Sequence, residues 1–147
     1  MNTTVIYTCK DGYQLYGRKI GEYLQSISCA INTTDGTVFW EGVYNLTSCI
    51  PINCENPPTF LNALLINTTY SNVEVNISNT IKGNPYFLGS TVIYACNSGY
   101  RFNHTGQISA VLTCNTVPNQ THIAAWDPSN IACVRMFIIR KNRFSEV

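Results

Sequence analysis

The sequence predicts an all-β chain made of two small, elongated, disulfide-rich modules of short antiparallel strands in tandem. Residues 4–13 (TVIYTCKDGY) are repeated 87 positions later as residues 91–100 (TVIYACNSGY), with seven of the ten positions identical. A period of this length is typical of consecutive small domains rather than of a solenoid. Apolar residues alternate with a period of two in several short runs, and no stretch longer than about ten residues has a clear helical period.

Seven cysteines are spread along the whole chain: Cys9, Cys29, Cys49, Cys54, Cys96, Cys114 and Cys133. Modules of about 60 to 80 residues bury little apolar surface, so cross-links would contribute much of their stability. No C-x-x-C pair occurs, and only two histidines are present, so disulfides explain the cysteines better than zinc does. Four cysteines allow three pairings, and spacing alone does not select one.

The first unit, residues 1–49, opens on a strand in which Val5, Tyr7 and Cys9 share one face. Gly12 suits a turn after it, because glycine adopts a positive φ without strain. Further strands are predicted at residues 13–16, 23–30 and 37–40, with a turn at residues 32–36. Residues 50–53 form a short linker that Pro51 stiffens.

The second unit, residues 54–133, is organised around the second copy of the repeat, where Val92, Tyr94 and Cys96 share a face. A strand at residues 108–114 and a turn at residues 118–121 follow. The Asn-rich residues 67–85 are predicted to form a solvated loop, with a recognition loop as the alternative. Residues 134–147 form a basic tail, whose four Lys/Arg and single Glu give a net charge of +3.

Alignment of the two units in sequence pairs Cys9, Cys29, Trp40 and Cys49 with Cys96, Cys114, Trp126 and Cys133. Cys54 has no counterpart in the first unit, so that unit is expected to lack its opening segment. The N-terminus also has no apolar run of the kind found in signal peptides. We therefore expect the chain to be a fragment of a longer protein.

An extracellular location is predicted from the glycosylation acceptor triplets, Asn-x-Ser/Thr. Seven occur where composition alone would give about three, at Asn2, Asn32, Asn45, Asn67, Asn76, Asn103 and Asn119. Disulfides also persist in that compartment. The alternative is that a chain rich in Asn and Thr accumulates such triplets by chance.

Several functional classes find no support in the sequence. No basic stripe suits nucleic acid, and no apolar run is long enough to span a membrane. No nucleophile or carboxylate stands beside a histidine in a catalytic arrangement, and His104 and His122 are expected at the surface. The large aromatic residues are expected in the core: Trp40, Trp126, Tyr7, Tyr94 and Tyr100.

The order Cys54, FLGSTVIYACNSGY at residues 87–100, Cys114, Trp126 and Cys133 resembles a sushi domain, also called a complement control protein module. The four-residue gap between Cys49 and Cys54 is similar to the family's spacing between modules. The departures are a long Cys54 to Cys96 spacing, Ala-Ala before Trp126, and no proline two residues before either last cysteine. These concern loop shape.

The resemblance implies pairing of first with third and second with fourth cysteines. Cys54 would bond Cys114, and Cys96 would bond Cys133. In the first unit Cys9 would bond Cys49, which leaves Cys29 as an unpaired thiol.

The resemblance also implies a noncatalytic extracellular module that binds another extracellular or cell-surface protein, without metal or cofactor. The alternatives are a structural spacer in a multidomain ectodomain, or an accessory module of a complement-type serine protease whose catalytic domain is absent. Predicted partner contacts lie at the module junction and beside it: Ile50, Pro51, Ile52, Asn53, Tyr70, Lys82 and Tyr86. Sugars on Asn67 and Asn76 would shield that face.

Overall fold

The computed structural model describes residues 3–71 and 85–137, and every regular element in them except one turn of 3-10 helix is a β-strand. The first unit contains β1 (Thr4–Thr8), β2 (Tyr13–Leu15), β3 (Leu24–Ile31), β4 (Val38–Glu41), the 3-10 turn η1 (Val43–Asn45) and β5 (Cys49–Pro51). The second contains β6 (Ala63–Thr69), β7 (Thr91–Cys96), β8 (Tyr100–Phe102), β9 (Ser109–Val117), β10 (Gln120–Asp127) and β11 (Cys133–Arg135). The predicted all-β class of short antiparallel strands is confirmed.

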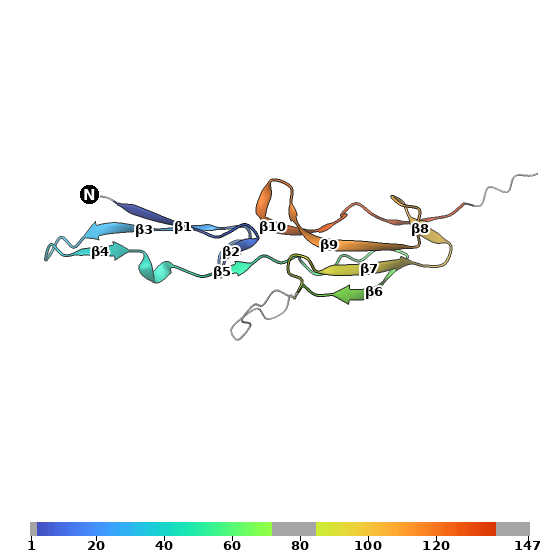
Figure 1. The fold of residues 1–147 in the computed structure, drawn as a ribbon, viewed down its shortest axis with the longest axis horizontal. Helices are drawn as coiled ribbons and strands as arrows, with labels where there is room; N and C mark the ends of the chain where they lie inside the picture. The colour runs from blue at the N-terminus through green and yellow to red at the C-terminus, as the bar shows by residue number, and fades with distance from the viewer. Residues whose placement is uncertain (1–2, 72–84, 138–147) are drawn as a thin grey trace, which may run out of the picture.

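The two units follow one another along the long axis of the molecule (Figure 1). The first has a three-stranded sheet in the order β1-β3-β4, and the second a four-stranded sheet in the order β10-β9-β7-β6. Two-stranded ribbons, β2-β5 and β11-β8, complete the described structure. Residues 50 and 51, expected in the linker, belong to β5, where Pro51 lies opposite Tyr13.

The main core lies inside the second unit. Val92, Phe102, Leu112 and the two half-cystines Cys54 and Cys114 are fully buried there. Alternation along β7 and β9 directs Val92, Leu112 and Cys114 to one face of the sheet, as the period-two pattern predicts. This core therefore holds β9 and β10 in place, and β10 carries the residues that contact the first unit.

The polar stretch at residues 67–85 is not entirely loop. Its first three residues belong to β6, which pairs antiparallel with β7 and places Thr68 opposite Val92. The expectation of a solvated loop is therefore wrong for residues 67–69, because these residues pair with β7 whatever the polarity of their side chains. Residues 72–84, which hold the rest of that stretch, lie outside the described part of the chain.

Two aromatic residues expected in the core are half exposed. Trp40 is 43% and Tyr7 45% exposed, whereas their counterparts Trp126 and Tyr94 are 8% and 3% exposed. In the second unit the segment after Cys54 contacts these side chains. In the first unit the described residues leave Trp40 and Tyr7 half exposed, although Ile27 on the same face is 7% exposed. The core assignment of Trp40 and Tyr7 is therefore wrong, while Tyr100 is half buried.

Candidate functional site: the junction groove

The two units are joined by a bulge in β10. The register between β10 and β9 shifts between Gln120, opposite Val117, and Ala124, opposite Thr116. The three residues between Gln120 and Ala124 therefore leave the ladder and project toward the first unit, as bulges commonly do when they redirect side chains. The hairpin that carries them lies beside β2 (Figure 1).

This bulge binds the turn that follows β1. The Thr121 carbonyl accepts a hydrogen bond from the Gly12 amide at 2.8 Å, and the Thr121 hydroxyl lies 3.0 Å from Asp11 Oδ1. Gly12 has φ of +81°, so a side chain here would strain the backbone. The Gly12 carbonyl in turn accepts the Ile52 amide at 2.9 Å. The repeated Gly-Tyr turn of the first unit is thus bonded to both the linker and the second unit.

His122 is the central side chain of the junction. Its ring stacks on Tyr23 with centroids 3.9 Å apart and planes 9° apart. Nδ1 lies 2.8 Å from the Tyr13 carbonyl oxygen, which can only accept, so this nitrogen carries the proton. Nε2 lies 4.0 Å from Asp11 Oδ1. His122 is 9% exposed, and the expectation that it lies at the surface is wrong.

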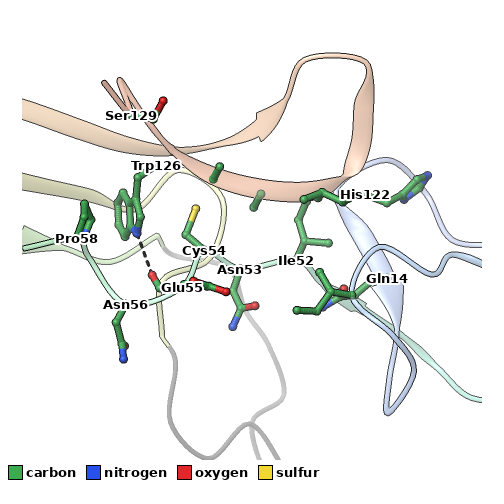
Figure 2. A pocket seen from close by; sticks show the side chains of 14 residues that line it. Gln14, Ile52, Asn53, Cys54, Glu55, Asn56, Pro58, His122, Trp126 and Ser129 are labelled. Carbon is green, nitrogen blue, oxygen red and sulfur yellow. Dashed lines mark hydrogen bonds between the residues drawn. The ribbon is translucent and has the colours of Figure 1, made fainter. Parts of the chain in front are cut away.

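A groove of about 550 Å³ lies beside this junction. Figure 2 shows Ile52, Cys54 and Trp126 along it, with Gln14 of the first unit at one end. Asn53, Glu55, Asn56 and Ser129 provide polar groups, and the remaining lining residues are Ile20, Pro58, His122, Ile123, Ala124 and Ala125. An apolar groove with a few polar groups is typical of binding sites.

Trp126 forms a fixed wall of the groove. Its indole Nε1 donates to the Glu55 carbonyl oxygen at 2.9 Å, as the dashed line in Figure 2 shows. On another side its ring makes an edge contact with Tyr86, with centroids 5.5 Å apart. Because both ends of the ring are held, this wall is already in place before any partner binds.

The phenol groups near this wall stay neutral at physiological pH. Burial raises the pKa of the Tyr94 hydroxyl above its ordinary value, and Tyr86 adds to that shift. Burial likewise raises the pKa of Tyr86, with Tyr70 contributing. Tyr94 therefore remains a donor, and it donates to the Pro58 carbonyl oxygen.

The predicted partner contacts do not all lie together. Ile52 and Asn53 line the groove, although Ile52 is only 1% exposed and forms part of its floor. Ile50 and Pro51 pair with β2. Tyr70 and Tyr86 contact each other, with ring centroids 5.6 Å apart, outside the groove lining. Lys82 lies outside the described residues.

Sequence reasoning missed the residues that build the groove from the first unit and from the bulge. Gln14, Ile20 and His122 are among them, and Ser129, which follows β10, was missed as well. One signal was present: Gly12 and Tyr13 stand in the repeat, yet in the first unit they precede a second module. In the first unit this turn is bonded to the second unit through the Gly12 amide, whereas in its counterpart the Gly99 carbonyl accepts the Met136 amide.

Disulfides close both units. Cys54 bonds Cys114, Cys96 bonds Cys133 and Cys9 bonds Cys49, which is the pairing that the resemblance implies. Cys29 is a free, half-buried cysteine. Among residues 3–71 and 85–137, no three His, Cys, Asp or Glu side chains cluster in a way that could hold a metal ion.

Five acceptor asparagines lie in the described ranges: Asn32, Asn45, Asn67, Asn103 and Asn119. All are exposed except Asn32, which is partly buried and whose side-chain oxygen accepts the Thr34 amide. Asn2 and Asn76 lie outside those ranges. Within residues 3–71 and 85–137, no helix is long and apolar enough to cross a membrane.

Comparison with protein families gives a match. The family model described as Sushi repeat (SCR repeat) matches residues 54–133, which is more than half of the chain and coincides with the second unit. No match was found among curated proteins. With its four half-cystines, its buried Trp126 and its paired β7 and β9 in that range, the chain belongs to the sushi repeat family.

Proposed function

We propose that this chain is an extracellular protein-binding part of a longer mosaic protein, and that it recognises its partner through the junction groove. The family supports the general class, because sushi repeats are noncatalytic protein-interaction modules of the complement control type. The specific site rests on the groove itself, which combines apolar walls with polar groups and lies where two units meet.

A second part of the proposal concerns domain organisation. We propose that residues 1–49 are a module of the same kind without its first cysteine segment, that residues 50–53 link the modules, and that residues 134–147 are a basic tail. The strand registers support this correspondence: Cys29 lies opposite Trp40 in the first unit, just as Cys114 lies opposite Trp126 in the second.

The observation that carries the binding proposal is the rigidity of the groove. Trp126 is anchored at 2.9 Å to Glu55, and the bulge beside it is bonded to the first unit. A partner that inserts an aliphatic or small aromatic side chain would bury it without first ordering the walls. Preorganisation of this kind lowers the entropic cost of binding.

The test is a pull-down from extracellular fluid with the oxidised chain and two arginine variants. Ala125→Arg places a long charged side chain at an exposed position of the groove lining. Gln107→Arg makes the same kind of change at an exposed position outside the groove. We expect a partner that is retained by the wild type and by Gln107→Arg, and lost with Ala125→Arg.

Two results would count against the proposal. A partner retained equally by both variants would place recognition elsewhere on the molecule. Absence of any partner at micromolar concentrations would favour the structural spacer instead, for which the bonded junction between the units is also suited.

A further inference from the structure

The end of the second unit that is remote from the first unit is formed by the turn between β7 and β8 and by the residues that follow β11 (Figure 1). The Gly99 carbonyl in this turn accepts the Met136 amide at 3.0 Å, which holds the residues after β11 against the turn. Arg101, Ile108 and Met136 line one cavity of about 340 Å³ here. Segments from different parts of the sequence therefore form one surface.

Large apolar side chains are exposed at this end of the molecule. Phe137 is 86%, Ile108 60% and Met136 49% exposed. Leu61 is 85% exposed and belongs to the same end, because the residue after it accepts a backbone hydrogen bond from the Asn97 amide. A group of exposed apolar side chains is typical of a surface that contacts a protein or a membrane.

The charges at this end are positive. Arg101 and Arg135 supply the ionised side chains of the described segments that form it, residues 61–62, 96–101, 108 and 133–137. The carboxylates of the second unit within the described ranges, Glu55 and Asp127, lie elsewhere. Glu55 lines the junction groove. Asp127 lies across β9 from Thr91, the first residue of β7, which is about 17 Å along the strand from the last residue of β7.

The sequence after β11 continues this combination of apolar and basic residues. Residues 136–139 (MFII) are apolar, and residues 140–143 (RKNR) add three cations before the single Glu146. No glycosylation acceptor triplet begins in residues 61–62, 96–101 or 134–147, so no sugar is expected on these segments. Residues 134–147 also contain no cysteine, so no further unit follows Cys133 at the spacing that separates Cys49 from Cys54.

We propose that this end of the second unit binds the surface of an anionic phospholipid membrane. The binding surface, called the cationic tip below, consists of Leu61, Arg101, Ile108, Arg135, Met136 and Phe137. Basic side chains are attracted to anionic headgroups, and exposed apolar side chains enter the boundary between headgroups and acyl chains. An acidic polysaccharide would pair with the same cations but would leave the apolar side chains in water, so the lipid surface fits the cationic tip better.

The experiment measures co-sedimentation of the full oxidised chain with phosphatidylcholine vesicles that contain or lack phosphatidylserine. Binding is expected with the anionic vesicles alone. Arg135→Glu should weaken it by about 25-fold, because the variant loses one favourable charge and gains one unfavourable charge, each worth about fivefold. Arg18→Glu makes the same change of charge at an exposed position in the first unit. It should leave binding unchanged, because physiological salt screens charges beyond about 8 Å.

The apolar part of the cationic tip has its own test. Phe137→Ser should weaken binding to the anionic vesicles by about tenfold or more. Tyr44→Ser removes a fully exposed aromatic side chain from the first unit and should have no effect. Brominated phosphatidylcholine in the same vesicles should quench the added fluorescence of Phe137→Trp, and should not quench that of Trp40 and Trp126 in the wild type.

The inference is overturned if the anionic vesicles do not sediment the chain, if Arg135→Glu and Arg18→Glu bind equally, or if Phe137→Ser binds like the wild type. Retention on heparin without binding to the vesicles would also overturn it and would assign the cations to an acidic polysaccharide. None of these outcomes bears on the junction groove, because its variant, Ala125→Arg, leaves the cationic tip unchanged. The two proposals can therefore fail separately.

Discussion

Replacing His122 by alanine should loosen the junction between the units without unfolding either of them. The imidazole is the only side chain of the bulge that both stacks on the first unit, on Tyr23, and hydrogen-bonds to it, at the Tyr13 carbonyl, among the described contacts. It contributes nothing to the core cluster of the second unit. The substitution should therefore weaken the association of the two units and leave the stability of the second unit's core unchanged.

The magnitude follows from the two contacts. An aromatic pair in stacked geometry contributes about 0.5 to 1.5 kcal/mol beyond its area, and a hydrogen bond contributes about 1 kcal/mol net. The Tyr13 carbonyl can rebind water in the opened junction, so no larger penalty is expected. The change should cost about 2 kcal/mol of coupling, which is roughly a 30-fold change in the opening equilibrium.

Amide hydrogen exchange reports this opening directly. The Gly12 amide donates to Thr121 across the junction, and the Ile52 amide donates to the Gly12 carbonyl. Protection of both amides should fall by about 30-fold in His122→Ala. The amide of Cys114, which donates to Ser90 inside the second unit, should keep its protection.

The matched control is His104→Ala. His104 is exposed just after β8 and, among the contacts of the described residues, makes a T-shaped contact with Phe102, with centroids 6.1 Å apart. It should leave the protection of Gly12 and Ile52 unchanged. If the two histidine variants gave equal exchange at these amides, the stacked ring would not be what couples the units.

Three further predictions concern stability. Trp126→Ala should lower the free energy of unfolding by about 3 to 5 kcal/mol. Trp40→Ala should lower it by only about 1 to 2 kcal/mol, because Trp40 is 43% exposed. Equal losses of unfolding free energy in urea titrations would contradict the difference in burial between the two tryptophans. Replacing Cys54 and Cys114 together by serine should destabilise the second unit by about 4 kcal/mol on the chain-entropy model, since the bond spans 60 residues, and an unchanged urea midpoint would refute this. The pKa of Tyr94 is raised in the folded state, so its neutral form is favoured there; its contribution is fully present below the ordinary value of 10.0 and is lost as the pH rises through the raised value. Stability should therefore fall in strongly alkaline solution, and Tyr94→Phe, measured over the same pH range, should show a weaker fall.

Local patterns were sufficient for much of the second unit. The alternation of Val92, Tyr94 and Cys96 predicted which face of β7 is turned inward, and Val92 and Tyr94 are buried there. The repeat predicted the correspondence of Trp40 with Trp126, and both lie opposite a cysteine in the same register. The face of a strand on which a residue lies depends on the alternation of neighbouring residues along the pleated strand, and this alternation can be read from the sequence.

Residues 67–69 and His122 were assigned wrongly for a different reason. Asn67 and its neighbours look like a loop by composition, but pairing with β7 places them in a strand. His122 follows a predicted turn and looks exposed, but the bulge in β10 carries it onto Tyr23 of the other unit. Both outcomes depend on partners that lie far away in the sequence.

The sequence by itself determined the all-β class, the positions of several strands, the inward face of β7 and the correspondence of the cysteines between the units, because period-two alternation and an internal repeat are local and countable. Only the tertiary structure decided burial. Tyr7 and Tyr94 occupy equivalent places in the repeat, yet one is 45% and the other 3% exposed. The physical reason is that burial is a property of what covers a side chain, and the cover of Tyr94 comes from Pro58 and Phe60, more than thirty residues away in the chain.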